Sequence, residues 1–164
     1  MRAFLFCLLC LVLLVGACGE KAKEEAMEKE IEKATGSDVD VDLSKEGMKV
    51  TGKTEEGEYA LTTGEDTEIP EDFPDDVFLY SPSKTIMAMK VPDGHSVSLM
   101  TKDDMTKVVD AYKREMGDKG WTEEASVTMG KNMMLTYKKE GRMTGVNLAP
   151  SDDGLQIVVG TGKQ

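Results

Sequence analysis

The sequence predicts an α+β protein whose mainly antiparallel sheet packs against one helix, and three observations support this fold class. Short segments in which apolar and polar residues alternate recur along the chain, as they do in half-buried strands. Glycine-containing turns separate these segments, and Pro92-Asp93-Gly94 is a strong hairpin signal. Residues 101–119 instead have the periodicity of an amphipathic helix. One helix beside many strands is typical of an α+β sandwich.

The main domain is predicted to span residues 77–162, with the element order β-β-β-α-β-β-β-β. Glycine-containing turns at Gly130-Lys131, Glu140-Gly141 and Asp152-Asp153-Gly154 separate the last four strands, so an antiparallel arrangement is expected. The strands are expected at residues 77–80, 85–91, 96–101, 121–129, 132–138, 142–149 and 155–160.

The helix of this domain is predicted from its apolar face. We expect Thr101 or Asp103 to cap its first turn, and Gly117 and Gly120 to end it near residue 119. Its apolar residues recur at the i, i+3, i+4, i+7 and i+11 positions, which lie on one side of a helix: Met105, Val108, Val109, Tyr112 and Met116.

Residues 37–63 are predicted to form a small three-stranded β-meander. Val39, Val41 and Leu43 alternate with aspartates, and two more strands are expected at residues 48–51 and 58–62. Three strands alone are marginally stable, so we expect the meander to lean on the preceding helix or on the main domain.

Residues 64–76 are predicted to form an acidic, proline-containing linker or extended strap. Pro70 and Pro74 disfavour regular structure here, and seven acidic residues surround them. Ile69 and Phe73 are the large apolar residues of the segment, and we expect them to pin it to the domain.

Residues 18–36 are predicted to hold a short charged tether helix. Residues 20–34 are rich in Glu, Lys and Ala, which favour helix. Met27, Ile31 and Ala34 form one narrow apolar stripe, and Gly36 is a plausible stop. The segment is too short for the three heptads that a coiled coil requires.

The first residues have the pattern of a signal peptide. Arg2 is followed by an uninterrupted apolar run to Val15 and then by the small residues Gly16 and Ala17. The run is shorter than the roughly 20 residues that a membrane-spanning helix needs. Two interpretations of this segment are an ordinary cleaved signal peptide and an uncleaved N-terminal anchor. The residues that end at Cys18 favour a third and more specific one, described next.

The residues Val15-Gly16-Ala17-Cys18 resemble the lipobox of bacterial lipoproteins. The resemblance implies a signal peptide over residues 1–17, cleavage before Cys18, and lipid attachment to the Cys18 thiol, with acyl chains of the palmitate type. It also implies that the chain is anchored in the cell envelope. Because Gly19 rather than aspartate follows the cysteine, the outer membrane, facing the periplasm, is favoured in a Gram-negative cell.

A second resemblance covers residue 69 to the C-terminus. Residues 69–74 and 77–84, the helix residues around Tyr112, and Gly120-Trp121 are similar to a domain of uncharacterised bacterial envelope lipoproteins. That domain combines an acidic strap with a strand, a helix that has a central tyrosine, and a Gly-Trp pair. The similarity implies architecture and location, but no reaction, because its motifs carry no catalytic residue.

Charge and cysteine content limit the possible partners and sites. The formal net charge of −11 repels nucleic acid and anionic lipid headgroups, so we expect no nucleic-acid partner. Cys7 and Cys10 lie in the signal and Cys18 would carry lipid, so the mature chain would have no free thiol and no disulfide. No phosphate-binding loop or zinc-peptidase motif is present in the sequence.

Two residues of the main domain are candidates for a partner or ligand surface. His95 is the only histidine and follows a turn, so we expect it to be exposed at a hairpin rather than catalytic. Trp121 directly follows the predicted helix. It is a candidate to line a ligand groove, although sealing the core between helix and sheet is the more common role of such a residue.

The twelve methionines suggest one possible metal site. Thioethers suit Cu(I), and Met87, Met89, Met133 and Met134 are candidate ligands in strands or beside a turn. Filling an irregular core is the alternative role for these flexible side chains.

The function that the sequence favours is a non-enzymatic, lipid-anchored envelope protein that presents an acidic α+β interaction domain. Its partners would be the membrane, through lipid on Cys18, and other envelope proteins, with no cofactor. The alternatives are a small-ligand or Cu(I)-binding periplasmic module that uses methionine side chains, and an enzyme with an unfamiliar carboxylate site.

Overall fold

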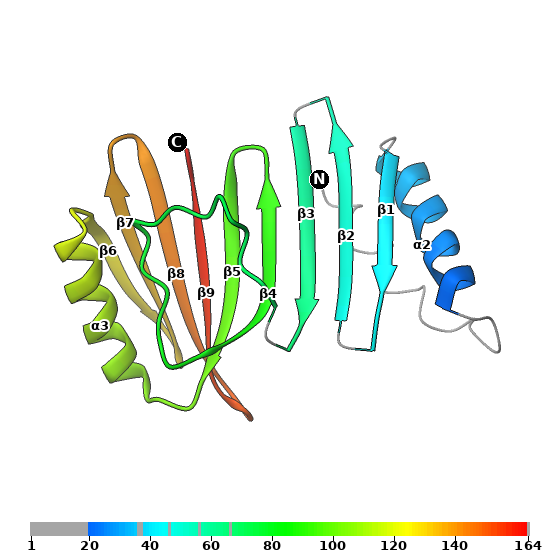
Figure 1. Cartoon of the computed structure of the whole chain (residues 1–164). Helices are drawn as coiled ribbons and strands as arrows, with labels where there is room; N and C mark the ends of the chain where they lie inside the picture. Colours follow the sequence, from blue (N-terminus) through cyan, green and yellow to red (C-terminus); the bar gives the residue numbers. More distant parts are fainter. Residues whose placement is uncertain (1–19, 36–37, 46, 56, 66, 164) are drawn as a thin grey trace.

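A computed structural model describes the chain as one antiparallel sheet with helices, for residues 20–35, 38–45, 47–55, 57–65 and 67–163 (Figure 1). Within these residues the sheet has nine strands in the order β1-β2-β3-β4-β5-β9-β8-β7-β6. Every neighbouring pair is antiparallel. The predicted α+β class with a mainly antiparallel sheet is therefore confirmed.

Short turns join most consecutive strands, as the glycine pattern predicted, whereas a long segment separates β3 from β4. The bounds are α2 Glu20–Thr35, β1 Asp38–Leu43, β2 Gly47–Thr54, β3 Gly57–Gly64, β4 Lys84–Val91, β5 Gly94–Thr101, α3 Met105–Asp118, β6 Thr122–Met129, β7 Asn132–Lys139, β8 Arg142–Ser151 and β9 Gly154–Lys163.

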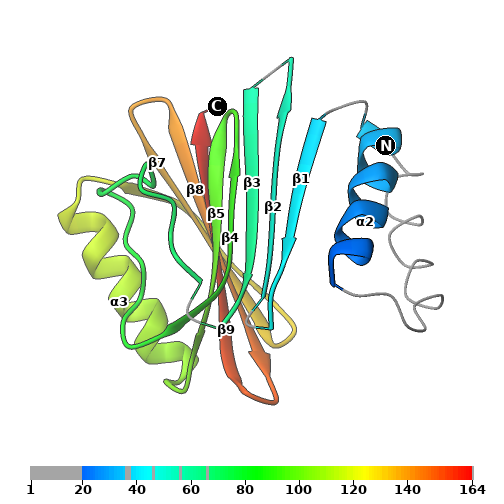
Figure 2. The same cartoon turned by 45° about the vertical axis from the view of Figure 1, so that its right-hand side comes forward.

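The element order differs from the prediction in two places. Residues 77–80, predicted as a strand, form no ladder and belong instead to a strap, residues 67–83, that crosses one face of the sheet (Figures 1 and 2). The meander of β1, β2 and β3 continues the main sheet, because Leu61 pairs with Met89 and Thr62 with Ala88. This pairing satisfies backbone groups of β4 that an edge strand would leave open.

The larger core lies between the sheet and the layer formed by α3 and the strap. Val97, Val159, Val146 and Leu135 are paired across four adjacent strands and are each 0% exposed. Paired residues share a face of the sheet, so this row defines the face that α3 covers, here called the α3 face. The predicted apolar side of the helix is confirmed by the burial of Val108, Val109, Tyr112 and Met116 against it.

The α3 helix begins slightly later than predicted. Its N-cap is Asp104, whose carboxylate accepts a hydrogen bond from the Lys107 N–H at 2.9 Å, so neither Thr101 nor Asp103 has this role. The Asp103 carboxylate is instead bound by the Tyr80 hydroxyl at 2.5 Å. Gly120 has a φ of +82°, which favours glycine and turns the chain from α3 toward β6.

A smaller core lies on the opposite face of the sheet. Val41, Val50 and Leu61 are paired across β1, β2 and β3, and Met27 and Ile31 of α2 pack against this cluster. The predicted stripe on α2 is confirmed for these two residues, whereas the side chain of Ala34 and all of Gly36 lie outside the described residues. The two helices therefore lie on opposite sides of the sheet (Figure 2).

The α2 helix also covers the outer edge of β1. The backbone N–H groups of Val41 and Leu43 donate hydrogen bonds to the carboxylates of Glu28 and Glu24, at 3.1 and 2.9 Å. Two donors that an edge strand would otherwise present to another chain are thereby satisfied within this chain.

Candidate interaction surface

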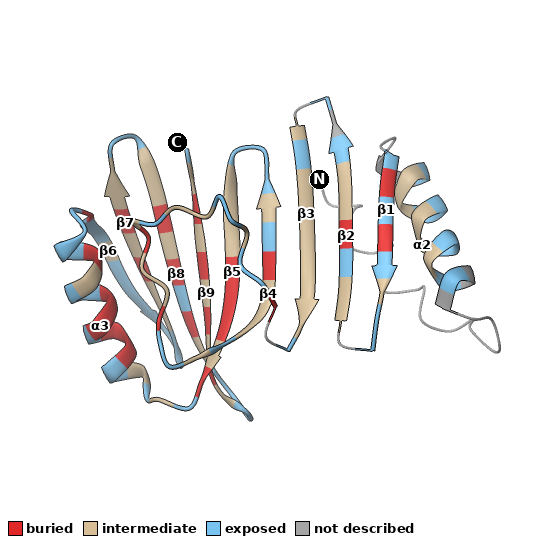
Figure 3. Cartoon of the chain, in the orientation of Figure 1, coloured by how far each residue is buried: buried red, intermediate tan, exposed pale blue. Residues whose placement is uncertain are grey.

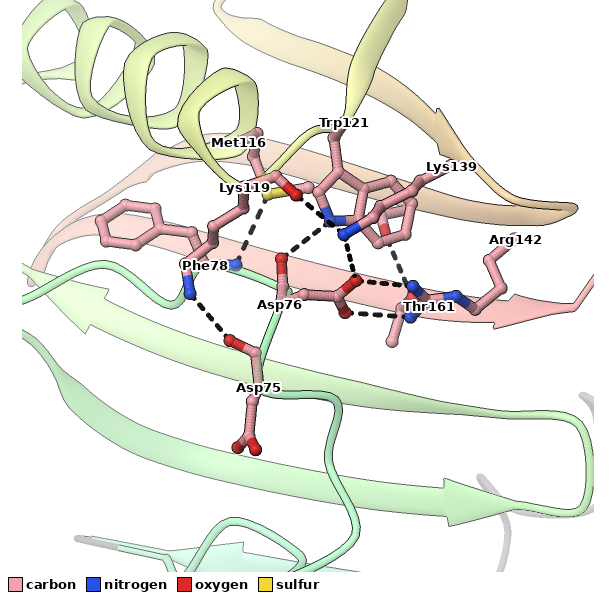
Figure 4. Close-up of polar contacts among 10 residues, drawn as sticks. Asp75, Asp76, Phe78, Met116, Lys119, Trp121, Lys139, Arg142 and Thr161 are labelled. Atoms are coloured by element: carbon pink, nitrogen blue, oxygen red, sulfur yellow. Dashed lines mark hydrogen bonds and ion pairs between the residues drawn. The ribbon is translucent and has the colours of Figure 1, made fainter.

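The strap is fastened to the α3 face by the carboxylate of Asp76 (Figure 4). The Arg142 guanidinium donates to both oxygens of Asp76, at 2.9 and 2.6 Å, and Lys139 Nζ donates at 2.8 Å. The hydrogen bonds from Arg142, and then from Lys139, hold the pKa of Asp76 well below its usual range, although partial burial opposes the shift. Asp76 therefore remains an anion that ties the strap to β7 and β8.

The β7–β8 hairpin brings these two cations together. Its turn consists of Glu140 and Gly141, with φ of 50° and 75°, and Lys139 pairs directly with Arg142 across it. Positive φ at both turn positions is typical of the tight hairpin turn that matches strand twist. Because paired residues share a face, both cations lie on the α3 face, beside the strap.

Trp121 closes the core next to this cluster and is not a ligand surface. Its side chain is 4% exposed, and its ring N–H donates to the Asp76 carbonyl at 2.7 Å. The Arg142 guanidinium lies 5.0 Å from the centre of the indole ring, within the range of a cation–π interaction. Trp121 therefore has the more common of its two expected roles, sealing the core, and its burial leaves no ring surface to line a ligand groove.

His95 also holds the strap and is not exposed at a hairpin as predicted. Its Nε2 lies 3.1 Å from Asp72 Oδ1, and its side chain is 13% exposed. Phe73 covers it edge-on, with 5.8 Å between ring centres. Lys90 Nζ contacts the other Asp72 oxygen at 2.5 Å, and this hydrogen bond, followed by that of His95, lowers the pKa of Asp72. His95 is covered because its side chain lies on the α3 face of β5, the face that the strap crosses.

Two hollows of the described surface are open to solvent. One, of about 580 Å³, lies beside Lys119, Lys138 and Lys139 near the start of β6, and a second lies over β2 and β3. Lys119 Nζ already donates to the Asp75 carbonyl at 2.7 Å, and Lys139 is bound to Asp76. Among the described residues, no three His, Cys, Asp or Glu side chains gather as a metal site.

The face of the sheet opposite α3 is not covered by a helix of the described chain along β4, β5, β9, β8, β7 and β6. This part of the sheet surface is here called the open face. Strand pairing places Met89, Ser96, Gly160, Gly145 and Thr136 in one row across it. Nothing lies within 4 Å of a Cβ built on Gly145 or Gly160, so this row is uncovered. Large apolar side chains flank it: Met87, Val91, Met100, Val127, Met129, Met134, Met143 and Val158.

The open face holds most of the exposed large apolar residues of the described chain, and its paired positions carry no acid. Four of the five exposed large hydrophobic residues of the described chain lie on it, namely Met89, Val91, Val127 and Met129. Its paired positions include no acidic residue, although the sequence holds 31 of them, and the charges that do occur are Lys84 and Lys138. These exposed residues lie at the two ends of the face, on β4 and β6, with small and partly buried side chains on the strands between them. Exposed apolar surface of this extent makes the face a candidate interaction surface.

The four methionines proposed as Cu(I) ligands are not brought together. Met87 and Met89 lie on β4, and Met134 shares their face but lies four strands away on β7, on the order of 19 Å at the usual strand spacing. Met133 lies on the other face and packs against the larger core. The four candidate ligands therefore cannot share one ion, because four strand spacings separate β4 from β7 and adjacent strand residues point to opposite faces. Met133 instead has the alternative role of filling the core.

Sequence reasoning missed Asp76, Lys139 and Arg142, which fasten the strap to β7 and β8. A turn signal at Glu140-Gly141 indicated that Lys139 and Arg142 are neighbours, but nothing local links them to an aspartate more than 60 positions earlier. The sequence carried a clearer signal for the open face. Met87 and Met89 occupy alternate positions of a predicted strand, and this spacing places both side chains on the same face of the sheet.

The predicted lipid-attachment residue Cys18 and the lipobox residues Val15, Gly16 and Ala17 lie outside the described residues. No helix in the described part of the chain is both long and apolar enough to cross a membrane.

Comparison with known proteins gives one family match. The sequence model of a family described as START domain-like matches residues 83–154, which is less than half of the chain of 164 residues. The matched region runs from β4 through α3 to the start of β9, and it leaves out α2, the first three strands and most of the strap. No curated protein and no solved structure matches the chain significantly.

Proposed function

We propose that this chain is a non-enzymatic, lipid-anchored envelope protein that binds another envelope protein through its open face. The single observation that carries the proposal is the lack of acidic residues at the paired positions of that face, in a chain with a formal charge of −11; Glu124, in the β6 bulge, is the acid at its margin beside Lys138. The expected partner therefore presents a neutral or weakly acidic apolar surface, because Lys84 and Lys138 are the charges that would meet it.

The chemistry of the face suits recognition rather than catalysis. Methionine side chains adapt to partner surfaces because they are unbranched and polarizable. The most buried polar group beneath them is Ser98, which is 1% exposed and accepts a hydrogen bond from the Gln156 side chain at 3.4 Å. A methionine-rich surface with a satisfied hydroxyl is suited to binding an apolar protein surface.

Lipid attachment at Cys18 is the part of the proposal that rests on the lipobox. Two or three acyl chains bury many methylene groups, at about 0.8 kcal/mol each, so the anchor would be effectively permanent. Mass spectrometry of the full chain from cells should find Cys18 at the N-terminus with diacylglyceryl and acyl groups. Cys18→Ser should abolish the modification and should release the chain from membranes. A Cys18→Ser chain with the same mass and the same membrane fractionation as the wild type would contradict lipidation.

The interaction can be tested with a photo-crosslinking residue at position 89 in cells, followed by identification of the captured protein. The purified partner should then bind the full chain, and Met89→Glu or Asn147→Glu should weaken binding at least tenfold. Thr51→Glu is the matched control, because position 51 lies on the α3 face of β2, so that the added acid lies away from the open face. Equal weakening by all three variants, or binding unaffected by any of them, would overturn the proposal.

A further inference from the structure

The two edges of the sheet differ in how their backbone groups are satisfied. At β1, Glu24 and Glu28 accept hydrogen bonds from the outer N–H groups. At β6 the closing pair of the hairpin is Met129 and Asn132, so Ala125, Val127 and Met129 bond inward to β7. The N–H and C=O groups of Ser126 and Thr128 therefore point outward, and within the described chain no hydrogen bond to another element satisfies them.

The outer part of β6 lacks the features that usually protect an edge. Residues 125–129, Ala-Ser-Val-Thr-Met, contain no charge and no proline, in a sequence that is 31% charged. Val127 and Met129 are 40% and 56% exposed, and Figure 3 shows β6 as an exposed strand at the end of the sheet. A bulge between Glu123 and Ala125 ends the regular edge on one side, and the turn after Met129 ends it on the other.

This segment is complementary to itself in the antiparallel direction. If a two-fold axis passes through Val127, Ser126 of one copy lies opposite Thr128 of the other, and these are the residues whose backbone groups point outward. Ala125 then lies opposite Met129 on the open-face side, so a small side chain meets a large one. Val127 meets its own copy at a pair without hydrogen bonds, where the backbones approach most closely.

The charges that flank the segment favour the same arrangement. Glu123 and Glu124 precede it and Lys131 follows it. Antiparallel pairing about Val127 brings the acidic end of each strand next to Lys131 of the other copy, whereas parallel pairing would align acid with acid. Two copies with a formal charge of −11 each repel one another elsewhere, so a neutral strand between opposite charges is where they can meet.

We propose that β6 pairs with β6 of a second copy of this chain, antiparallel and centred on Val127, to join the two sheets. The inference is separate from the proposed function, because it concerns the sheet edge and needs neither lipid nor another protein. Failure of the experiments below would leave binding through the open face untouched.

The first experiment uses charge at the two-fold axis. The full chain in mild detergent should sediment as a dimer, and Val127→Asp or Val127→Lys should each weaken dimerisation at least tenfold, because like charges meet at the axis. An equimolar mixture of the two variants should restore the dimer. A wild-type chain that is monomeric at every concentration, or a dimer that both variants leave intact, would overturn the proposal.

The second experiment tests the register and does not depend on a charged variant folding. Cys7, Cys10 and Cys18 are first replaced by serine, which leaves no other thiol in the full chain. Val127→Cys should then form a disulfide-linked dimer under mild oxidation. Ser126→Cys is the matched control, because its own copy would lie two residues out of register, about 7–8 Å away and too far for a disulfide. Equal cross-linking by the two variants would contradict pairing centred on Val127.

Discussion

The two halves of the sheet bury opposite faces, and this difference explains how the molecule leaves one apolar surface open. Along β5, β9, β8 and β7 the α3 face is covered by α3 and the strap, which are held by ion pairs at Asp76 and Asp72. Along β1, β2 and β3 the core is small and lies on the other face, against α2. The open face continues the α2 side beyond the reach of α2, so its apolar residues have no cover in the described chain.

The largest expected effect tests whether the two cores differ in strength. Leu135→Ala removes a 0% exposed side chain from the larger core and should cost about 2–5 kcal/mol of unfolding free energy. The same change at Leu61, which is only partly buried in the smaller cluster, should cost less than half as much. Urea unfolding of the two variants measures both values, and equal losses would contradict the comparison.

The next effect concerns the ion pair that holds the strap. Asp76→Asn removes the charge that Arg142 and Lys139 bind, and should cost about 1.5–3 kcal/mol at pH 7, as expected for hydrogen bonds to a charged group. Asp75→Asn is the control, since Asp75 contributes its backbone carbonyl rather than its side chain to a contact with Lys119.

The pH dependence of that effect has a definite sign. Because the pKa of Asp76 is lowered in the folded state, its stabilisation is fully present above the unfolded pKa of about 3.9 and is lost as the pH falls toward the folded pKa. Acidification below about pH 4 should therefore narrow the stability difference between the wild type and Asp76→Asn. A difference that is constant with pH would show that the carboxylate charge is not what Arg142 and Lys139 recognise.

Local pattern predicted most of the secondary structure but not the pairing that joins distant segments. Alternation predicted β1, and the apolar spacing from Met105 to Met116 predicted α3 and its buried side. The strap residues Val77 and Tyr80 are apolar enough to resemble a strand, and they are indeed buried, but against α3 rather than within a ladder. Which face each half of the sheet buries depends on strand register, and no single segment contains that information.

A smaller effect is expected at the edge that α2 protects. Glu24→Ala with Glu28→Ala removes both acceptors for the Val41 and Leu43 N–H groups and should cost about 1 kcal/mol, while alanine keeps helix propensity high. Hydrogen exchange should accelerate several-fold at these two amides. Glu25→Ala, at an exposed position on the same helix, should leave them unchanged. Equal acceleration by both variants would mean that α2 covers the edge by packing alone.

The smallest stability effect should come from the open face, and it separates this surface most directly from the covered one. Met89→Thr keeps a residue that favours strands and should change the unfolding free energy by less than about 0.5 kcal/mol, because Met89 is 36% exposed. Met116→Thr removes a 0% exposed methionine beneath α3 and should cost several times more. Thermal unfolding of the monomeric chain gives both values. If the two losses were equal, Met89 would have to pack against part of its own chain, and the open face would not be available to a partner.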